Sequence, residues 1–544
     1  MNHEEILTYI AKGYWEQVFS TVSDGLKQNH KDHILYTMLG KYYERINVNQ
    51  AYLCYENAEF YCDENRDENY ATDLGLIQGL KSAIQTQDGF DLQKVSIVIV
   101  SYDMGEGDYL KECIKSIKET TPPQSYELLI VDNASTDGIA EWLKEQSDIK
   151  LICNGENKGF PYACNQGIKS AAGENDILLL HHDTVVLPNT IFYLRMGLYE
   201  RENVGATGSV TNGGQLTQGI GEQYQSTEES LRFAKTNNVP MKQPYEKKVF
   251  LNDFALLLKR TALDAIGLFD IRFTPGTCED WDIALRLHMA GYQLLLCHNS
   301  FLIHFCKEDG LNFVVGNEAL DKNIQKLKDK WGFALNYYAS PRNDLIAMMQ
   351  HKKEEAISLL EIGCGAGGTL AKLEHLFPNA SVCGIELTES LAKIGANQLN
   401  IIQGNIETMT LPYEQNSFDY ILFGDVLEHL YQPEDTIKRL LPYLKDTGVY
   451  LCSIPNIMHF SVLNPLLAGE FEYQDEGILD RTHLRFFTQN SIRNMFERCQ
   501  MDITRFCGRI GTGVFDLGLE QLPAEKQWEV YQYLVCVGKR SHKR

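Results

Sequence analysis

The feature that most constrains this chain of 544 residues is a glycine-rich turn that directly follows an apolar run. The run Ser358-Leu-Leu-Glu-Ile362 predicts a buried strand, and Gly363-Cys-Gly-Ala-Gly-Gly368 comes immediately after it. Glycines permit the tight turn and the close backbone approach that a bound nucleotide needs. The last part of the chain is therefore predicted to hold a nucleotide-binding α/β unit.

A second apolar run, Val95-Ser-Ile-Val-Ile-Val-Ser-Tyr102, opens another α/β unit well upstream. Predicted strands alternate with predicted helices after it, which favours a mostly parallel sheet. A chain of this length usually divides into about three or four domains. We expect three segments: an all-α helical region at 1–90, an α/β domain at 91–340 and a second α/β domain at 341–544.

Composition excludes several classes of protein. The net charge of −23 opposes non-specific binding to nucleic acid. The 14 cysteines include no Cys-x-x-Cys pair, so neither a zinc cluster nor a disulfide framework is predicted. No apolar run approaches the roughly 18 to 20 residues of a membrane span, and the first residues lack the pattern of a secretory signal. We expect a cytoplasmic protein, free or peripheral at the inner face of the membrane, with no integral membrane segment.

Residues 1–90 place apolar side chains at helical intervals. The segments Tyr14-Trp-Glu-Gln-Val-Phe19 and Val48-Asn-Gln-Ala-Tyr-Leu53 are similar at an offset of about 34 residues, which is the period of tetratricopeptide helix pairs. Two imperfect copies are fewer than a freestanding solenoid needs. Two interpretations follow: a helical cap packed on the next domain, or a docking surface for a protein or peptide.

Polar side chains follow three predicted strands of the middle segment. Ligands of open α/β sheets bind at the carboxyl ends of the strands. A carboxylate there can accept hydrogen bonds from a base or ribose, and a carboxylate beside a histidine can hold a divalent cation against a diphosphate. In strand order, the side chains are Ser101, Tyr102 and Asp103, then Asp132, Asn133, Ser135 and Asp137, then His181, His182 and Asp183.

The order of these and later motifs resembles the inverting glycosyltransferases of family 2, which have the GT-A fold. The resemblance covers roughly residues 94–310. It rests on Val98-Ile-Val-Ser-Tyr102, Ile130-Val-Asp-Asn-Ala-Ser-Thr-Asp137, Asn157-Lys-Gly-Phe160 with Asn165, His181-His-Asp183, Gly267-Leu-Phe-Asp270, Glu279-Asp-Trp-Asp282 with Arg286, Gly291-Tyr292 and His304.

The resemblance implies a site for a nucleotide sugar and a divalent cation, Mn²⁺ or Mg²⁺. The cation would be held by Asp183 with His181 and His304, although His181 stands where the family has the first aspartate of its Asp-x-Asp motif. His304 has a second interpretation as a buried core histidine. The side chains implied to bind the nucleotide sugar are Ser101, Tyr102, Asp132, Asn157, Asn165, His182 and Asp183.

The resemblance also implies a catalytic base. Asp280 would deprotonate the acceptor hydroxyl in a direct displacement with inversion, while Glu279 and Asp282 shape its surroundings. Taken alone, Asp280 has a second interpretation as a carboxylate stabilised at a helix N-terminus.

The glycine turn fits both the G-x-G-x-G of methyltransferases and the G-x-G-x-x-G of dinucleotide folds. Glu386 can accept the ribose hydroxyls of either cofactor and does not separate the two. The later motifs distinguish the two cofactors. Their order resembles class I S-adenosylmethionine-dependent methyltransferases, with a Rossmann-like fold, over residues 356 to about 500. These motifs are Gly404-Asn-Ile-Glu407, Leu411-Pro-Tyr413, the run 417–430 with Asp425, the run 444–448 and Ser453-Ile-Pro-Asn456.

The second resemblance implies a site for S-adenosylmethionine. Methyl transfer to a hydroxyl needs alignment of the reacting atoms and a base. Candidate bases are His429, His459 and His483, of which His483 is favoured because its run Asp480–Phe487 recurs in such enzymes. The cofactor would be bound by Glu361, Gly363, Gly365 and Gly367 at the methionine part, Glu386 at the ribose, Asn405 and Ile406 at the adenine, and Asp425 below the sulfonium.

The leading hypothesis is a bifunctional enzyme that transfers a sugar from a nucleotide donor with inversion and O-methylates a sugar hydroxyl, in the synthesis of surface polysaccharide or glycoprotein glycans. Tethering raises the concentration of one product near the other site. The implied partners are the donor, a glycan or glycoprotein acceptor, and a protein at the N-terminal helices. One alternative keeps only the methyltransferase active beside a glycosyltransferase-like scaffold. Another is a protein-modifying methyltransferase that docks its substrate on the helices.

Overall fold

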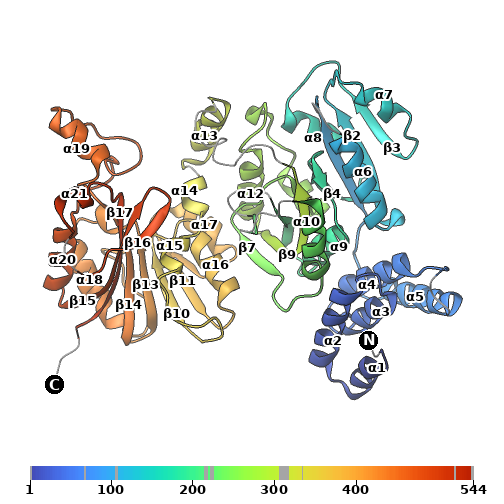
Figure 1. Ribbon diagram of the computed structural model, residues 1–544, viewed down its shortest axis with the longest axis horizontal. Helices are drawn as coiled ribbons and strands as arrows, with labels where there is room; N and C mark the ends of the chain where they lie inside the picture. The colour runs from blue at the N-terminus through green and yellow to red at the C-terminus, as the bar shows by residue number, and fades with distance from the viewer. Residues whose placement is uncertain are drawn as a thin grey trace. The chain divides into compact units, whose positions relative to one another are not determined.

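In the computed structural model the chain forms two compact units, Met1–Leu335 and Asn336–Arg544 (Figure 1). Within the described part of the chain, every helix is too short or too polar to span a lipid bilayer. The division into three domains at residues 90 and 340 stays a prediction. The residues described are 3–65, 69–103, 108–212, 218–220, 226–305, 318–333, 335–519 and 522–540.

Five helices open the first unit, as the apolar periodicity of residues 1–90 predicted. Each of them packs on the next along the chain. Gly40 lets the helix at His33–Tyr43 approach the helix at Val48–Tyr61 closely, because a Cβ at this position would lie 2.3 Å from the ring of Tyr55. A tetratricopeptide relation is suggested only by this helical arrangement. The helices are α1 (His3–Lys12), α2 (Trp15–Gln28), α3 (His33–Tyr43), α4 (Val48–Tyr61) and α5 (Tyr70–Gln85).

These helices pack on α9 (Thr190–Leu198) of the same unit. Arg195 of α9 forms a buried ion pair with Glu56 of α4. The side-chain amide of Gln50 donates to the carbonyl of Met196 at 2.8 Å, and Phe192 joins the apolar core of the helices. One face of the helical region is therefore covered within the unit, as the helical-cap interpretation expects.

The sheet of the first unit is mixed, and its strands in the described residues follow the order β3-β2-β1-β4-β8-β6-β9-β5, with β7 also paired to β9. The half from β3 to β4 is parallel, as predicted, whereas β8 runs antiparallel to both of its neighbours. The strands are β1 (Val95–Ser101), β2 (Tyr126–Asp132), β3 (Ile149–Cys153), β4 (Asp176–Leu180), β5 (Thr184–Val185), β6 (Val204–Thr211), β7 (Tyr245–Lys248), β8 (Ala255–Leu258) and β9 (Gln293–His304).

Helices cover both faces of this sheet. Helices α6, α7 and α9 bury apolar side chains on one face, while α8 packs on β1 and β2. Gly167 of α8 makes this second contact close, because a Cβ there would lie 2.3 Å from Val98. The remaining helices of the unit are α6 (Tyr109–Thr120), α7 (Ile139–Lys144), α8 (Phe160–Ser170), α10 (Thr227–Asn237), α11 (Arg260–Ile266), α12 (Glu279–Met289) and α13 (Glu318–Trp331).

The second unit is built on one sheet with the order β12-β11-β10-β13-β14-β17-β15-β16 in its described residues. The five strands from β12 to β14 are parallel, and β17 inserts antiparallel between β14 and β15. Strand β17 therefore lies inside the sheet, although it comes last along the chain. The strands are β10 (Ser358–Ile362), β11 (Ser381–Glu386), β12 (Ile401–Gln403), β13 (Phe418–Gly424), β14 (Leu444–Pro455), β15 (Met501–Ile510), β16 (Gly513–Asp516) and β17 (Gln532–Lys539).

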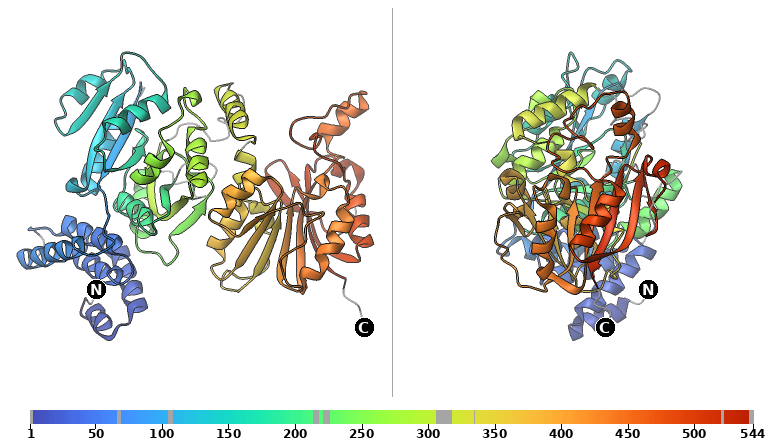
Figure 2. Two further views of the ribbon diagram at one scale, coloured as in Figure 1. Left: turned by 180° about the vertical axis from the view of Figure 1, so that it is seen from behind. Right: turned by 90° about the vertical axis from the view of Figure 1, so that its left-hand side faces the viewer.

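Two apolar layers cover this sheet, with α15, α16 and α17 on one face and α18 and α20 on the other. In Figure 2 the sheet passes without a break from the yellow strands to the red ones. Strand order reverses at β10, and such switch points bind ligands at the carboxyl ends of the strands. The helices are α14 (Leu335–Ala339), α15 (Asn343–Ile346), α16 (Gly368–Leu376), α17 (Glu389–Ala396), α18 (Pro433–Leu440), α19 (Phe460–Leu467), α20 (Gln489–Arg498) and α21 (Ala524–Gln527).

Candidate active sites

Three predicted strand ends meet at one edge of the first sheet. The amide of Asn133, just after β2, donates to the carbonyl of Ser101 at the end of β1. His182, just after β4, has Nδ1 at 3.3 Å from the carbonyl of Val100. Asp132 is buried and accepts from the Ser135 amide at 3.3 Å, whereas Tyr102 is exposed. The predicted nucleotide-sugar residues of these three strands thus lie together.

His181, Asp183 and His304 form a group whose potential ligand atoms all lie within 4.8 Å of one another. His304, the last residue of β9, reaches the Asp183 carboxylate with Nε2 at 3.2 Å. Burial opposes ionisation of Asp183, but the hydrogen bond and charge of His304, together with the charges of His181 and His182, outweigh it and hold the pKa of Asp183 well below its usual range. The structure therefore brings together the three residues predicted to hold a cation, and a carboxylate with two imidazoles suits a divalent ion.

A buried acidic cluster lies beside this group. His181 reaches the Asp253 carboxylate at 3.3 Å, and Glu279 and Asp280 begin α12. Burial, then the charge of Asp253, raises the pKa of both Glu279 and Asp280 well above the usual range. Oδ1 of Asp280 accepts the amide of Trp281 at 2.9 Å. A buried carboxyl with a raised pKa is a strong base once it is ionised, which suits the role predicted for Asp280.

The Asn157-Lys-Gly-Phe160 motif positions the loop that leads into α12. The Phe160 amide donates to the Pro275 carbonyl at 2.7 Å. Gly159 has φ of 82°, and a Cβ there would lie 2.6 Å from Thr274. The Asn157 side chain accepts from the Gly159 amide at 2.9 Å. In this structure the motif orders the backbone that carries the acidic cluster.

Asn165 uses both ends of its amide on the backbone of Phe269, donating at 2.8 Å and accepting at 2.9 Å. The predicted contact of Asn165 with a nucleotide sugar stays a prediction, because this side chain visibly holds a chain segment in place.

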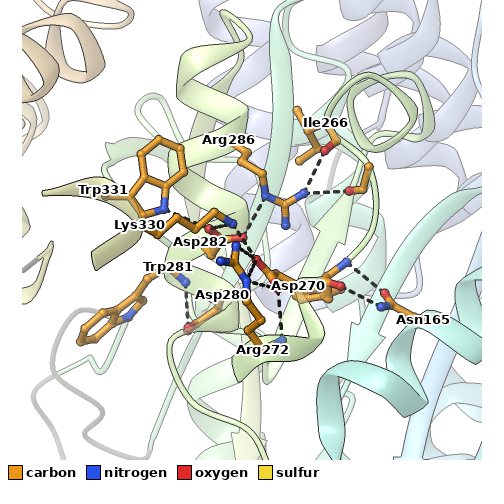
Figure 3. Close-up of polar contacts among 12 residues, drawn as sticks. Asn165, Ile266, Asp270, Arg272, Asp280, Trp281, Asp282, Arg286, Lys330 and Trp331 are labelled. Atoms are coloured by element: carbon orange, nitrogen blue, oxygen red, sulfur yellow. Dashed lines mark hydrogen bonds and ion pairs between the residues drawn. The ribbon is translucent and has the colours of Figure 1, made fainter. Parts of the chain in front are cut away.

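Three side chains hydrogen-bond or ion-pair with the Asp282 carboxylate, as Figure 3 shows. Arg286 Nε donates to it at 2.9 Å, Trp331 Nε1 donates at 3.0 Å, and Lys330 pairs with it at 2.5 Å. Lys330 also pairs with Asp270 at 2.8 Å. Helix α13 therefore fastens both ends of the segment between Asp270 and Asp282, which the sequence did not reveal.

Asn323 of α13 holds the same segment at its centre. Its amide donates to the carbonyls of Phe273 at 2.9 Å and Thr277 at 3.1 Å. Asn323 is 1% exposed. No motif flagged this residue, because its importance depends on a contact across 46 residues of sequence.

The glycine turn of the second unit closes on a neighbouring segment. Gly363, Gly365 and Gly367 have φ of 66°, 55° and 88°, a region that residues with a Cβ rarely adopt. A Cβ on Gly365 would lie 2.7 Å from the carbonyl of Tyr338, and one on Gly363 would lie 2.7 Å from Val426. The turn thus requires glycine for conformation and for space.

Glu386, at the end of β11, anchors this turn. One carboxylate oxygen accepts the Gly365 amide at 2.8 Å, and the other accepts the Thr388 amide at 2.8 Å. The next strand places Asn405 nearby, where its side chain accepts the Glu407 amide at 2.8 Å, while Ile406 is buried. The residues predicted to bind ribose and adenine therefore follow adjacent strands at the edge that carries the turn.

Glu361 is 3% exposed, and its Oε2 has no hydrogen-bond partner among the described residues. Burial raises the pKa of Glu361 to about 8, although a hydrogen bond with Thr369 and the charge of Arg342 oppose the shift. A buried carboxyl with an unused oxygen fits a role in binding the amino group of a methionine moiety.

Asp425 is held by Arg342, Ser453 and Gln532, of which only Ser453 belongs to a motif quoted from the sequence. Arg342 Nη1 pairs with Oδ2 at 2.7 Å, and Ser453 Oγ donates to Oδ1 at 2.8 Å. Gln532 of β17 also donates to Oδ1. The backbone φ of Asp425 is 56°, which is unusual for an aspartate and orients this turn after β13. The turn beneath the predicted sulfonium site is thus fixed from three separate segments.

The three histidines proposed as bases have different surroundings. His459 caps α19 by accepting the Ser461 amide at 3.3 Å, which is a structural role. His429 and His483 pack against each other with ring centroids 4.7 Å apart. The catalytic role of His483 stays a prediction, but the structure places it beside the turn that carries Asp425, because the backbone carbonyl of Glu428 accepts from the Leu484 amide at 2.8 Å.

Comparison with known proteins identifies both units. Residues 96–267 match the family model described as glycosyl transferase family 2, and residues 331–505 match the one described as methyltransferase domain. Two transferase domains share this chain. The first is a GT-A glycosyltransferase domain and the second a Rossmann-like methyltransferase domain, preceded by the helical region α1–α5, so the predicted fold classes are confirmed.

Three similar proteins each match part of the chain. A demethylmenaquinone methyltransferase of Shouchella clausii is 26% identical over 196 residues, 30% of this chain and 83% of that protein. Similar solved structures include GalNAc-T7 with UDP, GalNAc and Mn²⁺ (TM-score 0.36, 16% identity, 54% of this chain and 55% of that one). Another is an S-adenosylmethionine-dependent methyltransferase from Aquifex aeolicus (TM-score 0.27, 14% identity, 39% of this chain and 96% of that one).

Proposed function

We propose that the glycosyltransferase domain transfers a sugar from a nucleoside diphosphate donor with inversion, and that the methyltransferase domain O-methylates a sugar hydroxyl of the same glycan. The observation that carries the first half is the group His181, Asp183 and His304 beside the buried Asp280. Tethering the two sites favours successive reactions on one surface polysaccharide or glycoprotein glycan.

In the glycosyltransferase domain the residues divide into two roles. Asp183, with His181 and His304, would hold the Mn²⁺ or Mg²⁺ ion that offsets the charge developing on the departing diphosphate. Asp280 takes the proton of the acceptor hydroxyl, and Glu279 keeps its surroundings acidic and dry. Asp282 contributes by fastening the start of α12 rather than by contact with substrate.

In the methyltransferase domain the residues shape a site for S-adenosylmethionine, which supplies an electrophilic methyl group when bound. The glycine turn and Glu361 would bind the methionine part, Glu386 the ribose, and Asn405 the adenine. The match of residues 331–505 to a methyltransferase family supports this cofactor. We assign His483 to activation of the acceptor hydroxyl.

The two alternatives have less support. The scaffold hypothesis rested on His181, yet His181 joins Asp183 and His304 in a group suited to a cation. Docking of a protein substrate on the N-terminal helices competes with the contact that α4 makes with α9. We keep a protein partner at the other faces of these helices, and action in the cytoplasm or at the inner membrane face, as parts of the proposal. The 13 described cysteines form no disulfide with one another, which suits a reducing compartment.

A thermal-shift experiment on the full chain tests the proposal. We expect uridine diphosphate, or another nucleoside diphosphate, to raise the melting temperature in the presence of Mn²⁺. S-adenosylhomocysteine should raise the melting temperature independently. Asp183→Ala should remove only the first effect, and Gly365→Arg, which fills space against Tyr338, only the second. Products are then identified by transfer of labelled sugar and labelled methyl to oligosaccharide. Binding of S-adenosylhomocysteine alone, without any nucleotide effect, would favour the scaffold alternative.

A further inference from the structure

Three side chains of the methyltransferase domain gather into a group with the donors of a metal site. Glu428 and His429 follow β13, and His483 comes from the Asp480–Phe487 run. Their potential ligand atoms all lie within 4.8 Å of one another. Two ligands about 2.1 Å from one ion are at most about 4.2 Å apart, so small side-chain rotations bring all three into range.

The Glu428 carboxylate gives the strongest indication that this group binds a cation. The residue is 1% exposed, and neither carboxylate oxygen has a hydrogen-bond partner among the described residues. An uncompensated buried carboxylate is costly, and native proteins pair such groups or use them to bind metal ions. Asp425 adds a second negative charge nearby, while Arg342 is already engaged with Asp425.

The two histidines are oriented as metal ligands are. His483 Nδ1 donates to the Ile478 carbonyl at 2.9 Å, and His429 Nδ1 lies 3.2 Å from the Thr482 carbonyl and 3.1 Å from Thr482 Oγ1. The Thr482 hydroxyl donates to Asp480 at 2.6 Å, so its oxygen is free to accept from His429. Both rings thus carry the proton on Nδ1 and leave Nε2 as the lone-pair donor, the usual arrangement around a bound metal.

We propose that Glu428, His429 and His483 form a divalent-cation site, distinct from the one in the glycosyltransferase domain, that binds and activates the acceptor hydroxyl for methyl transfer. Two imidazoles and one carboxylate suit a first-row ion from Mn²⁺ to Zn²⁺. The role toward the acceptor rests on the proposed O-methylation, whereas the cation site does not.

The cation lowers the pKa of the hydroxyl bound to it, as a metal does for bound water. The hydroxyl proton passes to solvent, and the oxygen forms the new bond to the methyl carbon of the sulfonium. The carbon–sulfur bond breaks with its electron pair on sulfur, which leaves neutral S-adenosylhomocysteine. His483 then acts through the cation rather than as the base itself.

Cobalt binding tests the site without any activity. Full chains carrying Asp183→Ala, which disables the other candidate site, are titrated with Co²⁺ and followed by visible absorption and by metal content after dialysis. We expect one Co²⁺ per chain, with affinity reduced at least about tenfold by Glu428→Gln or His483→Asn. Thr482→Val should weaken binding by about 10- to 100-fold by releasing the His429 ring.

His351→Asn is the matched control, because His351 contacts Tyr420 in the same domain and lies outside the group. Retained stabilisation by S-adenosylhomocysteine shows that each variant is folded. Unchanged Co²⁺ binding in both Glu428→Gln and His483→Asn would overturn the proposal.

Chelation separates this proposal from the proposed function. If methyl transfer to oligosaccharide falls with chelator and returns with Mn²⁺ or Co²⁺, both stand. If Co²⁺ binds at the group but no sugar is methylated, the cation site stands and the sugar acceptor is wrong. If sugars are methylated equally with chelator, and the variants bind Co²⁺ normally, the cation site is wrong and the function stands.

Discussion

Two carboxylates on one turn of α12 have opposite surroundings. Asp282 is surrounded by Arg286, Lys330 and Trp331, whereas Asp280 lies buried near Asp253, another acidic group. The negative charge of Asp282 therefore stabilises the fold, whereas a negative charge on Asp280 destabilises it. Sequence alone assigns both residues to one motif and cannot separate a fastening carboxylate from a reactive one.

We predict opposite effects for the two amide variants. Asp282→Asn should lower the stability of the first unit by about 1–3 kcal/mol, because partly exposed cations lose a buried partner. Asp280→Asn should leave stability equal or higher, since it removes a buried charge, while sugar transfer falls at least about 100-fold. Thermal unfolding and transfer rates are compared. Equal destabilisation by both variants would contradict the distinction.

Glu361 makes a pH dependence predictable. Burial raises its pKa to about 8, with Thr369, Arg342 and Glu386 also facing it. Between the unfolded pKa near 4.3 and the folded value, the folded state holds the extra proton, so stability falls as pH rises through this window and levels off above it. Glu361→Gln should remove this slope.

At pH 8 we expect the melting temperature of the Glu361→Gln unit to exceed that of the unchanged protein by about 3 to 10 °C. The same variant should weaken S-adenosylhomocysteine binding about tenfold or more, because a charged carboxylate is needed for the amino group. Melting curves from pH 5 to 9 and calorimetric titration provide both quantities. A slope that survives in the variant would assign the pH dependence to another group.

At the scale of elements, the sequence predicts where individual strands and turns lie, but it does not predict which strands pair with one another. Apolar runs located β1, β4 and β10, and glycine spacing located the turn after β10, because backbone conformation there is set by nearby residues. The antiparallel β8 and the insertion of β17 beside β14 were not predictable, since pairing partners lie far apart in sequence.

The candidate sites divide in the same way. Strand-end residues such as Asp132, Asp183 and Glu386 could be named as candidates because they end or follow recognisable strands. Arg342 and Asn323 were missed, because each supports a site from another element and belongs to no motif. Such supporting contacts depend on tertiary packing, which one sequence does not display.

Helix α13 provides a test of such support. Asn323→Ala should free the loop before α12, lowering stability by about 1–3 kcal/mol and sugar transfer about tenfold, while nucleotide binding changes little. Gln325→Ala, on the exposed face of the same helix, is the matched control and should change neither. Transfer rates and donor affinity are measured together. Loss of donor affinity without loss of turnover would show that the loop serves binding instead.

At the scale of the whole molecule, two units with separate cores carry separate sites. Multidomain chains commonly depart from two-state unfolding, so each unit can melt on its own. Ligand binding stabilises only the unit that contains the site, by about 2.7 kcal/mol at a hundred times the dissociation constant. For the second unit, Asn336–Arg544, that corresponds to about 5 to 10 °C, and for the larger first unit, Met1–Leu335, to about 4 °C.

Differential scanning calorimetry of the full chain should therefore show two transitions. A nucleoside diphosphate with Mn²⁺ should raise one, and S-adenosylhomocysteine should raise the other, with both ligands adding independently. Asp183→Ala and Glu386→Ala serve as controls, each removing one shift and leaving the second. A single transition that either ligand raises would mean that the two cores unfold together, and the fusion would then link the enzymes energetically as well as by tethering.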